Sequence, residues 1–408
     1  MCKKICFLFW LALVLPFFLS AQYFFTPRLL VPYVEDAPEI GSRAAVLIDA
    51  DTGALLYSKN PDEEIPPASL TKLMTLHLAM NEIEEGRASY DEIIPVTVES
   101  WAQSQPPRSS LMFLAPGQIV TLREIMLGLA VPSGNDAAVA LALRLAPGMD
   151  VFARMMTEEA RRMGMNVTRF TESSGISEYN ITTASEFAFF CRQYIKLHPY
   201  SLREFHSVPV FSYPMAHNVP ENYRNNPRTI TQDNRNNLLK TFPGVDGLKT
   251  GYIDESGYNI ALTAQRNDTR FIAVILGAPA ESGGIRIRDN DGSRLLSWAF
   301  EKFKTVRAND VRIERERLWK GKENEVRLIT GEDADFTAPF DRANTLTFET
   351  VIPNPLIAPL PAGFPAGYLV ISDEYGELNR VPLITAYSYE RGNIFKRLWH
   401  SILLFFRR

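Results

Sequence analysis

Cysteine is scarce in this sequence, and two of its three cysteines, Cys2 and Cys6, lie close to the N-terminus. The third, Cys191, stands in the apolar stretch 187–191, where a buried thiol packs like any small apolar group. A lone cysteine cannot form an internal disulfide bond, so the fold must be held together by its hydrophobic core. With 46% hydrophobic residues among 408, the chain has ample apolar side chains for such a core.

Histidine is also scarce, and neither sign of charge is in large excess. The five histidines are scattered and form no His-Glu-x-x-His pair, which argues against a zinc peptidase, and we expect no metal and no cofactor. No Gly-x-Ser-x-Gly elbow and no glycine-rich phosphate loop occurs. The net charge of −4 gives no reason to expect nucleic acid as a partner.

The N-terminal residues have the composition of an export signal. Lys3 and Lys4 precede an apolar run, residues 5–19, which ends at small residues around Ala21. A short positive region, a hydrophobic stretch and a small residue are typical of a secretory signal peptide. We expect residues 1–21 to be such a peptide, so that the protein works at the outer face of the cytoplasmic membrane or in the periplasm. The alternative is an uncleaved membrane anchor.

Residues 36–305 are predicted to form one domain of mixed helices and strands. Strand-like runs gather at its two ends, at 44–49, 54–57, 245–250, 258–264 and 271–276, and helical runs lie between them, at 69–85, 122–129, 136–145, 150–163 and 184–197. A closing helix is expected at 295–303. Residues 200–240, rich in Asn, Pro, Arg and Tyr, are expected to be a long irregular surface segment. The pattern predicts an α/β (α+β) fold whose sheet is assembled from both ends of the domain.

The sequence from 309 to 388 has a different pattern. Short alternating runs, such as 326–328, 346–348 and 368–371, are separated by glycine, proline and acidic turns. Residues 373–377 are expected to form the tip of a hairpin between two such runs. These features predict a small all-β domain, within which we find no cluster of catalytic residue types.

The last segment, 391–408, is basic and amphipathic. It contains Arg391, Lys396, Arg397, Arg407 and Arg408 and no acidic residue. On a helix, two neighbouring apolar rows (Ile394, Leu398, Ile402, and Phe395, Trp399, Leu403, Phe406) would lie opposite Lys396, Arg397, His400 and Ser401. Such a helix is too short and too charged to span a bilayer but suits an anionic membrane surface. We therefore expect a membrane-anchoring helix, with docking on the β domain as the alternative.

Three short motifs carry the chemistry, and their order matters more than any one of them. The first is Ser69-Leu70-Thr71-Lys72, which places a hydroxyl and an amine three residues apart on one face of a helix. Serine alone is a poor nucleophile, but an adjacent neutral amine can take its proton. Lys72 can act in this way only if burial and neighbouring positive charge lower its pKa.

The other two motifs follow in the chain. Ser133-Gly134-Asn135 stands on a turn before a predicted helix, where its hydroxyl and amide can face a cleft together. Lys249-Thr250-Gly251 ends a predicted edge strand, where the lysine and the hydroxyl can receive an anion and the glycine permits close approach of a backbone. A Ser-x-x-Lys pair followed by these two motifs is typical of serine acyl-transfer enzymes.

At these motifs the sequence resembles the low-molecular-weight penicillin-binding proteins, which are D-alanyl-D-alanine carboxypeptidases. The stretches that carry the resemblance are 68–72, 109–113, 116–117, 133–137, 234–236, 246–251 and 257–259. The resemblance implies a β-lactamase- and transpeptidase-like fold, in which an antiparallel sheet lies between helices, with a C-terminal β-rich domain and an amphipathic anchor. It also implies removal of the terminal D-alanine from peptidoglycan pentapeptide stems, and binding of β-lactam antibiotics.

The resemblance further implies catalytic roles for individual residues. Ser69 would form the acyl-enzyme, and Lys72 would take its proton. Ser133 would relay a proton towards the departing D-alanine, and Asn135 would orient Lys72 and the substrate amide. The backbone N–H groups of Ser69 and Tyr252 would form the oxyanion hole.

Substrate binding is implied for a second set of residues. Lys249 and Thr250, with Gly251 completing the motif, would hold the terminal carboxylate of the substrate. Arg288 matches a family arginine that meets this carboxylate, with Arg286 as an alternative alignment and an ion pair to a neighbouring aspartate as the structural alternative. Tyr252 stands where relatives often carry histidine, which can alter pH dependence or substrate preference.

Three other functions fit parts of this pattern. A β-lactamase would use the same nucleophile but needs a second base for water, and segment 200–240 offers only Glu204 and Glu221, in no familiar arrangement. Endopeptidase action on peptidoglycan cross-links is a narrower variant of the same chemistry. A non-catalytic wall-binding protein is disfavoured, because it would not need to retain all three motifs.

Overall fold

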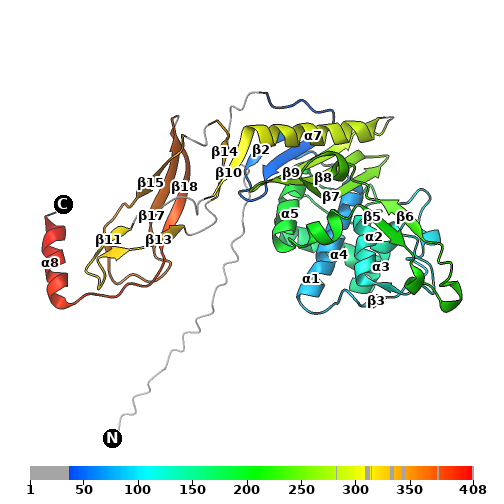
Figure 1. The fold of residues 1–408 in the computed structure, drawn as a ribbon, viewed down its shortest axis with the longest axis horizontal. Coiled ribbons are helices and arrows are strands. Elements are labelled where there is room, and N and C mark those ends of the chain that lie inside the picture. Colours follow the sequence, from blue (N-terminus) through cyan, green and yellow to red (C-terminus); the bar gives the residue numbers. More distant parts are fainter. Residues whose placement is uncertain are drawn as a thin grey trace, which may run out of the picture.

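The computed structural model describes residues 36–281, 283–307, 313, 315–330, 335–341, 345–374 and 376–406. The predicted signal peptide, residues 1–21, lies outside the described residues, as do Arg407 and Arg408 of the basic tail. The described chain forms a larger part of helices and strands and a smaller β-rich part, which follow one another in the sequence (Figure 1).

A five-stranded antiparallel sheet lies at the centre of the larger part, with the strand order β2-β1-β9-β8-β7. Its strands are β1 (Ala44–Asp49), β2 (Leu55–Lys59), β7 (Val245–Ile253), β8 (Gly257–Arg266) and β9 (Thr269–Ala278). The N-terminal hairpin pairs with β9, so the sheet is assembled from both ends of the domain, as predicted. Strand β7 lies at one edge.

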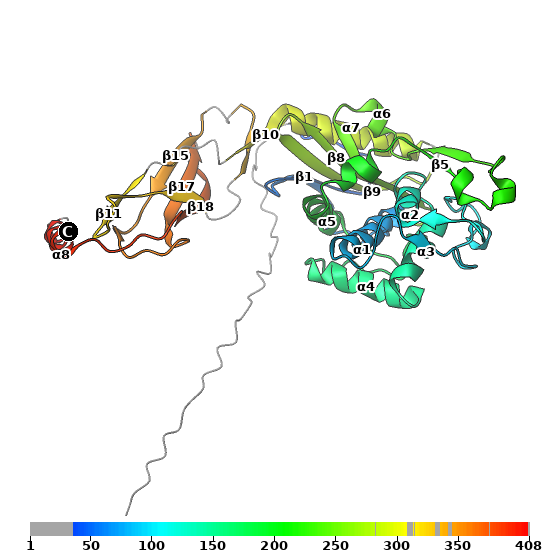
Figure 2. The same ribbon diagram turned by 60° about the horizontal axis from the view of Figure 1, so that its bottom comes forward.

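Helices cover both faces of this sheet (Figure 2). One face packs on α7 (Gly284–Lys302), and the other on the inserted block of α1 (Lys72–Glu84), α2 (Leu122–Ala130), α3 (Asn135–Leu145), α4 (Met149–Arg162) and α5 (Ala184–Leu197). Alternate strand residues therefore enter two different cores. Val46 packs with the inserted block, whereas its neighbour Leu47 packs with α7. Burial on both faces explains the nearly continuous apolar runs of these strands.

Two predicted elements differ from the structure. Helix α7 begins at Gly284, whereas the sequence predicts a helix only from residue 295. The first half of α7 was not predicted because it buries two charged side chains, Arg288 and Asp291, in place of apolar ones. Segment 200–240 is not irregular throughout, since it contains a helical turn (Leu202–His206) and the hairpin of β5 (Val210–Tyr213) and β6 (Ile230–Asp233). The hairpin strands are short, and most residues of β6 are exposed, so the sequence carries little apolar signal there.

The smaller part is built from short strands around its own apolar core. A four-stranded sheet has the order β13-β18-β17-β15, and a three-stranded sheet has the order β12-β11-β16. Their bounds are β11 (Glu316–Trp319), β12 (Glu325–Val326), β13 (Leu328–Thr330), β15 (Thr347–Val351), β16 (Leu356–Ile357), β17 (Pro365–Asp373) and β18 (Gly376–Thr385). Strands β17 and β18 pair up to Asp373 and Gly376, which places a hairpin where the sequence predicts one.

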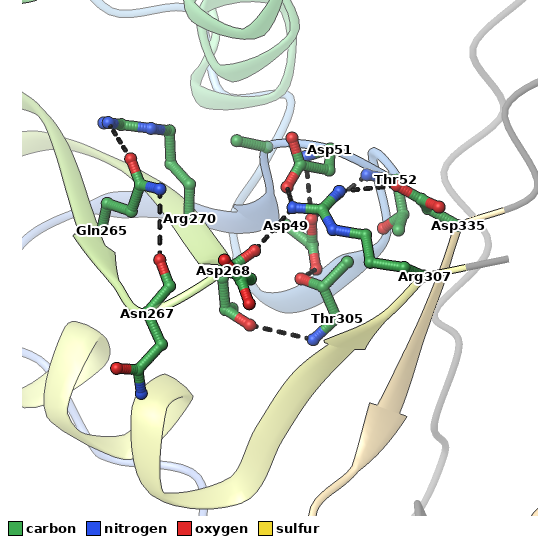
Figure 3. A network of polar contacts seen from close by, with 12 residues as sticks. Asp49, Asp51, Thr52, Gln265, Asn267, Asp268, Arg270, Thr305, Arg307 and Asp335 are labelled. Carbon is green, nitrogen blue, oxygen red and sulfur yellow. Dashed lines mark hydrogen bonds and ion pairs between the residues drawn. The ribbon is translucent and has the colours of Figure 1, made fainter. Parts of the chain in front are cut away.

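A polar junction ties the two parts together (Figure 3). Strand β10 (Phe303–Val306) follows α7 directly and pairs with β14 (Phe336–Pro339) of the smaller part. The buried carboxylate of Asp49, at the end of β1, accepts hydrogen bonds from Thr305 Oγ1 at 2.7 Å and Thr337 Oγ1 at 2.9 Å. Arg307 forms ion pairs with both Asp51 and Asp335. Charged hydrogen bonds of this kind restrain the position of one part relative to the other.

Helix α8 (Ile394–Phe405) docks on the smaller part through its polar face. His400 is buried, and its Nδ1 accepts a hydrogen bond from the backbone N–H of Lys320 at 2.8 Å. Lys396 Nζ donates to the backbone carbonyls of Lys322 and Glu323. The apolar face is left exposed, and it comprises Ile394, Phe395, Leu398, Trp399, Ile402, Phe405 and Phe406. The expected amphipathic helix is therefore present, and its apolar side faces away from the protein.

Candidate active site

Ser69 lies on a short 3₁₀ turn, Ala68–Thr71, that leads directly into α1. The sequence predicts a continuous helix from Ser69, whereas the α-helix itself begins at Lys72. Lys72 is fully buried, and its Nζ lies 2.9 Å from Ser69 Oγ. The three-residue spacing therefore brings the amine to the hydroxyl, as the Ser-x-x-Lys motif predicts.

Two further acceptors fix the amine of Lys72. Its Nζ donates to Asn135 Oδ1 at 2.8 Å and to the backbone carbonyl of Ser174 at 2.6 Å. When the amine is neutral, its two N–H bonds can serve these two acceptors, and its lone pair is then left to face the Ser69 hydroxyl. Burial lowers the pKa of Lys72 to about 7, although the nearby carboxylates of Glu172 and Asp136 act in the opposite direction. A base with such a pKa is partly neutral at physiological pH.

The Ser133-Gly134-Asn135 motif forms the turn before α3. Ser133 has a φ of +67°, and Asn135 is the first residue of the helix. The next residue, Asp136, accepts hydrogen bonds from the backbone N–H groups of Met112, Phe113 and Leu114. Burial raises the pKa of Asp136, and these backbone N–H groups oppose that rise. The carboxylate thus holds the loop at 112–114 against the second motif.

The Lys249-Thr250-Gly251 motif lies on the edge strand β7. Lys249 is buried, and its Nζ lies 2.8 Å from Ser133 Oγ, which joins the second motif to the third. Burial lowers the pKa of Lys249, and the positive charges of Lys72, Arg235 and Arg288 lower it further. Thr250 is buried beside Lys249.

The end of β7 approaches the nucleophile turn closely. A Cβ atom added to Gly251 would lie 2.8 Å from the carbonyl oxygen of Pro67 and 2.9 Å from the backbone nitrogen of Ser69. The bare glycine therefore lets β7 lie against the backbone of Ser69. Tyr252, the next residue, is 40% exposed, and its ring packs at a tilt against Tyr258 with ring centroids 4.3 Å apart.

Arg288 is buried on α7 and donates from both Nε and Nη2 to Asp289 Oδ1, at 2.8 and 2.6 Å. The ion pair weighed as the structural alternative is therefore present. The charge of Arg288 nevertheless reaches Lys249, whose pKa it helps to lower. Arg286, the alternative alignment, is exposed on the same helix.

Sequence reasoning missed three contributors to this site. Arg235 lies in the stretch 234–236, which was noted only as part of the family resemblance, and its charge acts on Lys249. Ser174 contributes a backbone carbonyl, for which no side-chain type gives a signal. Glu172 lies in the same loop, and its carboxylate acts on Lys72.

Comparison with known proteins identifies relatives over nearly the whole chain. A family model described as D-alanyl-D-alanine carboxypeptidase matches residues 32–280, and one described as the C-terminal domain of penicillin-binding protein 5 matches residues 300–391. The chain is 31% identical over 386 residues to the D-alanyl-D-alanine carboxypeptidase DacC of Escherichia coli strain K12, with 91% of this chain and 90% of that protein covered.

Solved structures of similar proteins agree with the observed fold. Penicillin-binding protein 5 from Haemophilus influenzae superposes with a TM-score of 0.76 at 27% identity, covering 87% of this chain and 99% of that one. Penicillin-binding protein D2 from Listeria monocytogenes, in its cefotaxime-bound form, superposes with a TM-score of 0.55 at 26% identity, covering 65% of this chain and 99% of that one.

Proposed function

The chain belongs to the D-alanyl-D-alanine carboxypeptidase family, and we propose that Ser69 is the nucleophile with which this serine peptidase removes the terminal D-alanine of peptidoglycan stem peptides. One observation carries the proposal. The buried amine of Lys72 lies 2.9 Å from Ser69 Oγ and is held by two fixed acceptors that direct its lone pair to that hydroxyl. This is the arrangement that an amine needs to activate a serine.

The proposed reaction has two halves. Lys72 takes the proton of the Ser69 hydroxyl as Oγ attacks the carbonyl carbon of the scissile D-Ala-D-Ala bond. The backbone N–H groups of Ser69 and Tyr252 stabilise the developing oxyanion. The proton on Lys72 then passes through the Ser133 hydroxyl to the amine of the departing D-alanine, the C–N bond breaks, and the acyl-enzyme remains on Ser69. Water releases the shortened peptide in the second half and restores the hydroxyl.

Recognition of the substrate carboxylate is assigned to the positive end of the site. Arg235 and Arg288 act electrostatically on Lys249, whose amine contacts Ser133, so positive charge is concentrated at this end of the site. Thr250, buried beside Lys249 on the edge strand β7, adds a hydroxyl. A terminal carboxylate bound there would place the preceding peptide bond over Ser69, which favours carboxypeptidase action over internal cleavage.

We predict that penicillin acylates Ser69 and no other residue. The full-length protein is incubated with benzylpenicillin and digested, and the adduct is mapped by mass spectrometry. One adduct on the peptide that contains Ser69, absent from Ser69→Ala, is expected. A D-Ala-D-Ala peptide should give a shorter-lived adduct at the same position. An adduct mapped to another serine would refute the assignment.

We also propose a division of labour along the chain, with catalysis in residues 36–305, a β-rich domain at 309–388, and membrane attachment through 391–408. The apolar face of α8 is exposed, while its polar face holds the helix on the β-rich part. Within the described residues, no helix has both the length and the apolar character to cross a bilayer. The exposed apolar face of α8 and the basic residues of 391–408 favour attachment to an anionic surface, at the outer face of the cytoplasmic membrane.

A chain that ends after Gly392 is expected to lose membrane binding but keep peptidase activity. This boundary preserves the β-bridge between Gly321 and Arg391, so the β-rich part keeps its strand contacts. Each base near an anionic surface contributes about 1 kcal/mol, and burial of the aromatic side chains adds more. Co-sedimentation with phosphatidylglycerol vesicles measures the binding, which high salt should weaken without abolishing.

Point variants separate the two faces of α8. Trp399→Glu changes the exposed apolar face and should reduce vesicle binding strongly. Ser401→Glu adds the same charge at an exposed polar position and serves as the control. Equal binding by the truncated and full-length proteins would show that α8 is not the anchor.

A further inference from the structure

The loop between α4 and α5 lies against the nucleophile turn. A Cβ atom on Gly175 would be only 1.8 Å from the carbonyl oxygen of Ala68 and 2.9 Å from the backbone nitrogen of Ser69. The carbonyl of the preceding residue, Ser174, accepts the 2.6 Å hydrogen bond from Lys72 Nζ. The position of this peptide group therefore directs one of the two N–H bonds of the neutral Lys72 amine, while Asn135 directs the other.

Glu172 holds that peptide group from its other side. Its Oε1 accepts a hydrogen bond from the backbone N–H of Gly175 at 2.6 Å. Its Oε2 accepts from the backbone N–H and the hydroxyl of Ser174, each at 2.6 Å. The Gly175 N–H and the Ser174 carbonyl belong to the same amide. A carboxylate that accepts from the N–H polarises the amide and makes its carbonyl a stronger acceptor for Lys72.

The remaining position on the Glu172 carboxylate is filled by Asn180, whose Nδ2 donates to Oε1 at 2.8 Å. The same amide donates to Thr71 Oγ1 at 3.2 Å, which links the loop to the nucleophile turn. The backbone N–H of Ser177 is a more distant fifth donor, at 3.5 Å from Oε1. A carboxylate offers about four lone-pair sites, and the four closer donors already occupy them. Glu172 has no site left for a hydrolytic water, so it is not placed to act as the second base that a β-lactamase needs.

Charges around Lys72 are balanced by groups from several elements. Glu172 and Asp136 favour the ammonium form of Lys72, whereas burial disfavours it. The charges of Lys249, on β7, and Lys72 repel each other, and Arg235 and Arg288 act on Lys249 in the same sense. Among the acidic groups, Glu172 has the larger effect on Lys72. Its charge therefore reaches the amine both through space and through the Ser174–Gly175 peptide group.

We propose that Glu172 is a positioning residue for the general base, which clamps the Ser174–Gly175 peptide group so that the lone pair of Lys72 faces Ser69. The inference rests on the proposed role of Lys72 as the base. Glu172 does not touch the reacting atoms and acts only through this peptide group and through its charge.

Glu172→Gln tests the proposal, because it removes the charge at nearly constant shape and replaces one acceptor by a donor. We expect the second-order rate of Ser69 acylation by benzylpenicillin to fall by about 10- to 100-fold. Removal of a negative charge lowers the pKa of Lys72, so the acidic limb of the pH–rate profile should move to lower pH, by about one unit. A purely structural role would reduce the rate without moving the limb.

Two further variants complete the experiment. Glu178→Gln makes the same charge change at an exposed position of the same loop. It should change neither the rate of Ser69 acylation nor the position of the acidic limb of the pH–rate profile. Glu172→Asp keeps the charge but shortens the clamp, so the rate should fall while the limb stays in place. If Glu172→Gln does not fold, an unreduced rate of Ser69 acylation in Glu172→Asp would overturn the proposed clamp.

The outcomes separate this proposal from the proposed function. An unmoved limb in Glu172→Gln, with Ser69 still acylated in the wild-type protein, overturns the role of Glu172 alone. If wild-type Ser69 is not acylated at all, the assignment of the nucleophile fails first.

Discussion

Replacement of Lys72 by alanine is expected to lower kcat/KM for a D-Ala-D-Ala peptide by at least about 10⁴-fold, the scale seen when a base and its nucleophile act as a unit. The Ser69 hydroxyl would keep its place on the 3₁₀ turn but lose the only amine that lies within hydrogen-bond distance of its oxygen among the described residues. Acylation by penicillin should slow to a similar extent, because it uses the same proton transfer.

Lys249→Arg is the informative comparison, because it keeps the positive charge beside Ser133. We assign Lys249 to substrate binding and electrostatics. The fall in kcat/KM of Lys249→Arg should therefore be smaller than that of Lys72→Ala, about 10- to 100-fold, and should come mainly from a higher KM. Equal losses in the two variants, with both proteins folded, would contradict the separate roles of the two lysines.

Stability gives an independent check on Lys72. Burial lowers the pKa of Lys72 to about 7 from an ordinary value of 10.5. Because the amine binds a proton more readily in the unfolded chain, its burial lowers the free energy of unfolding. This cost is complete below pH 7, declines between pH 7 and pH 10.5, and is absent at higher pH. Lys72→Met should therefore raise the free energy of unfolding at pH 7 relative to the wild-type protein. Denaturant melts at pH 7 and pH 10 measure both the gain and its decrease at the higher pH.

The three motifs show how much of the site could be predicted from sequence. Ser69 and Lys72 are separated by one helical turn, so local geometry alone brings them together. The contact between Ser133 and Lys249 joins residues more than a hundred positions apart, and only their combined occurrence suggested it. Burial of Lys72, which sets its pKa, depends on packing and could be stated beforehand only as a requirement.

Backbone contributions to the site could not be predicted in this way. The Ser174 carbonyl and the closely packed Gly175 act through main-chain atoms, whose positions depend on the path of a whole loop. The early part of α7 was missed for a related reason. Arg288 and Asp291 are charged residues that the fold buries with partners, Asp289 for the arginine and Ser42 for the aspartate. A search for apolar residues at helical spacing does not find them.

Gly251→Ala is expected to lower kcat/KM by about 10²- to 10³-fold, the effect of losing one oxyanion-hole donor. The glycine lies in the extended strand β7, so alanine is compatible with its backbone, and the cost comes from contact. The added Cβ would lie 2.8 Å from Pro67 O, 2.9 Å from Ser69 N and 3.1 Å from Ala68 Cβ. None of these atoms is the end of a flexible side chain, so β7 and the nucleophile turn must move apart.

That movement would separate the backbone N–H groups of Ser69 and Tyr252, which are the proposed oxyanion hole. Overpacking of this kind costs about 1–3 kcal/mol in stability, so melting is measured alongside activity. The control is Gly148→Ala, where the φ of 179° is also extended and the nearest atom is a side-chain oxygen of Asp150 at 3.2 Å. It should leave kcat/KM unchanged.

The acidic limb of the pH profile should stay in place in Gly251→Ala, because Lys72 keeps its partners while the oxyanion hole opens. Wild-type kcat/KM in a folded Gly251→Ala protein would show that this contact does not set the geometry of the site.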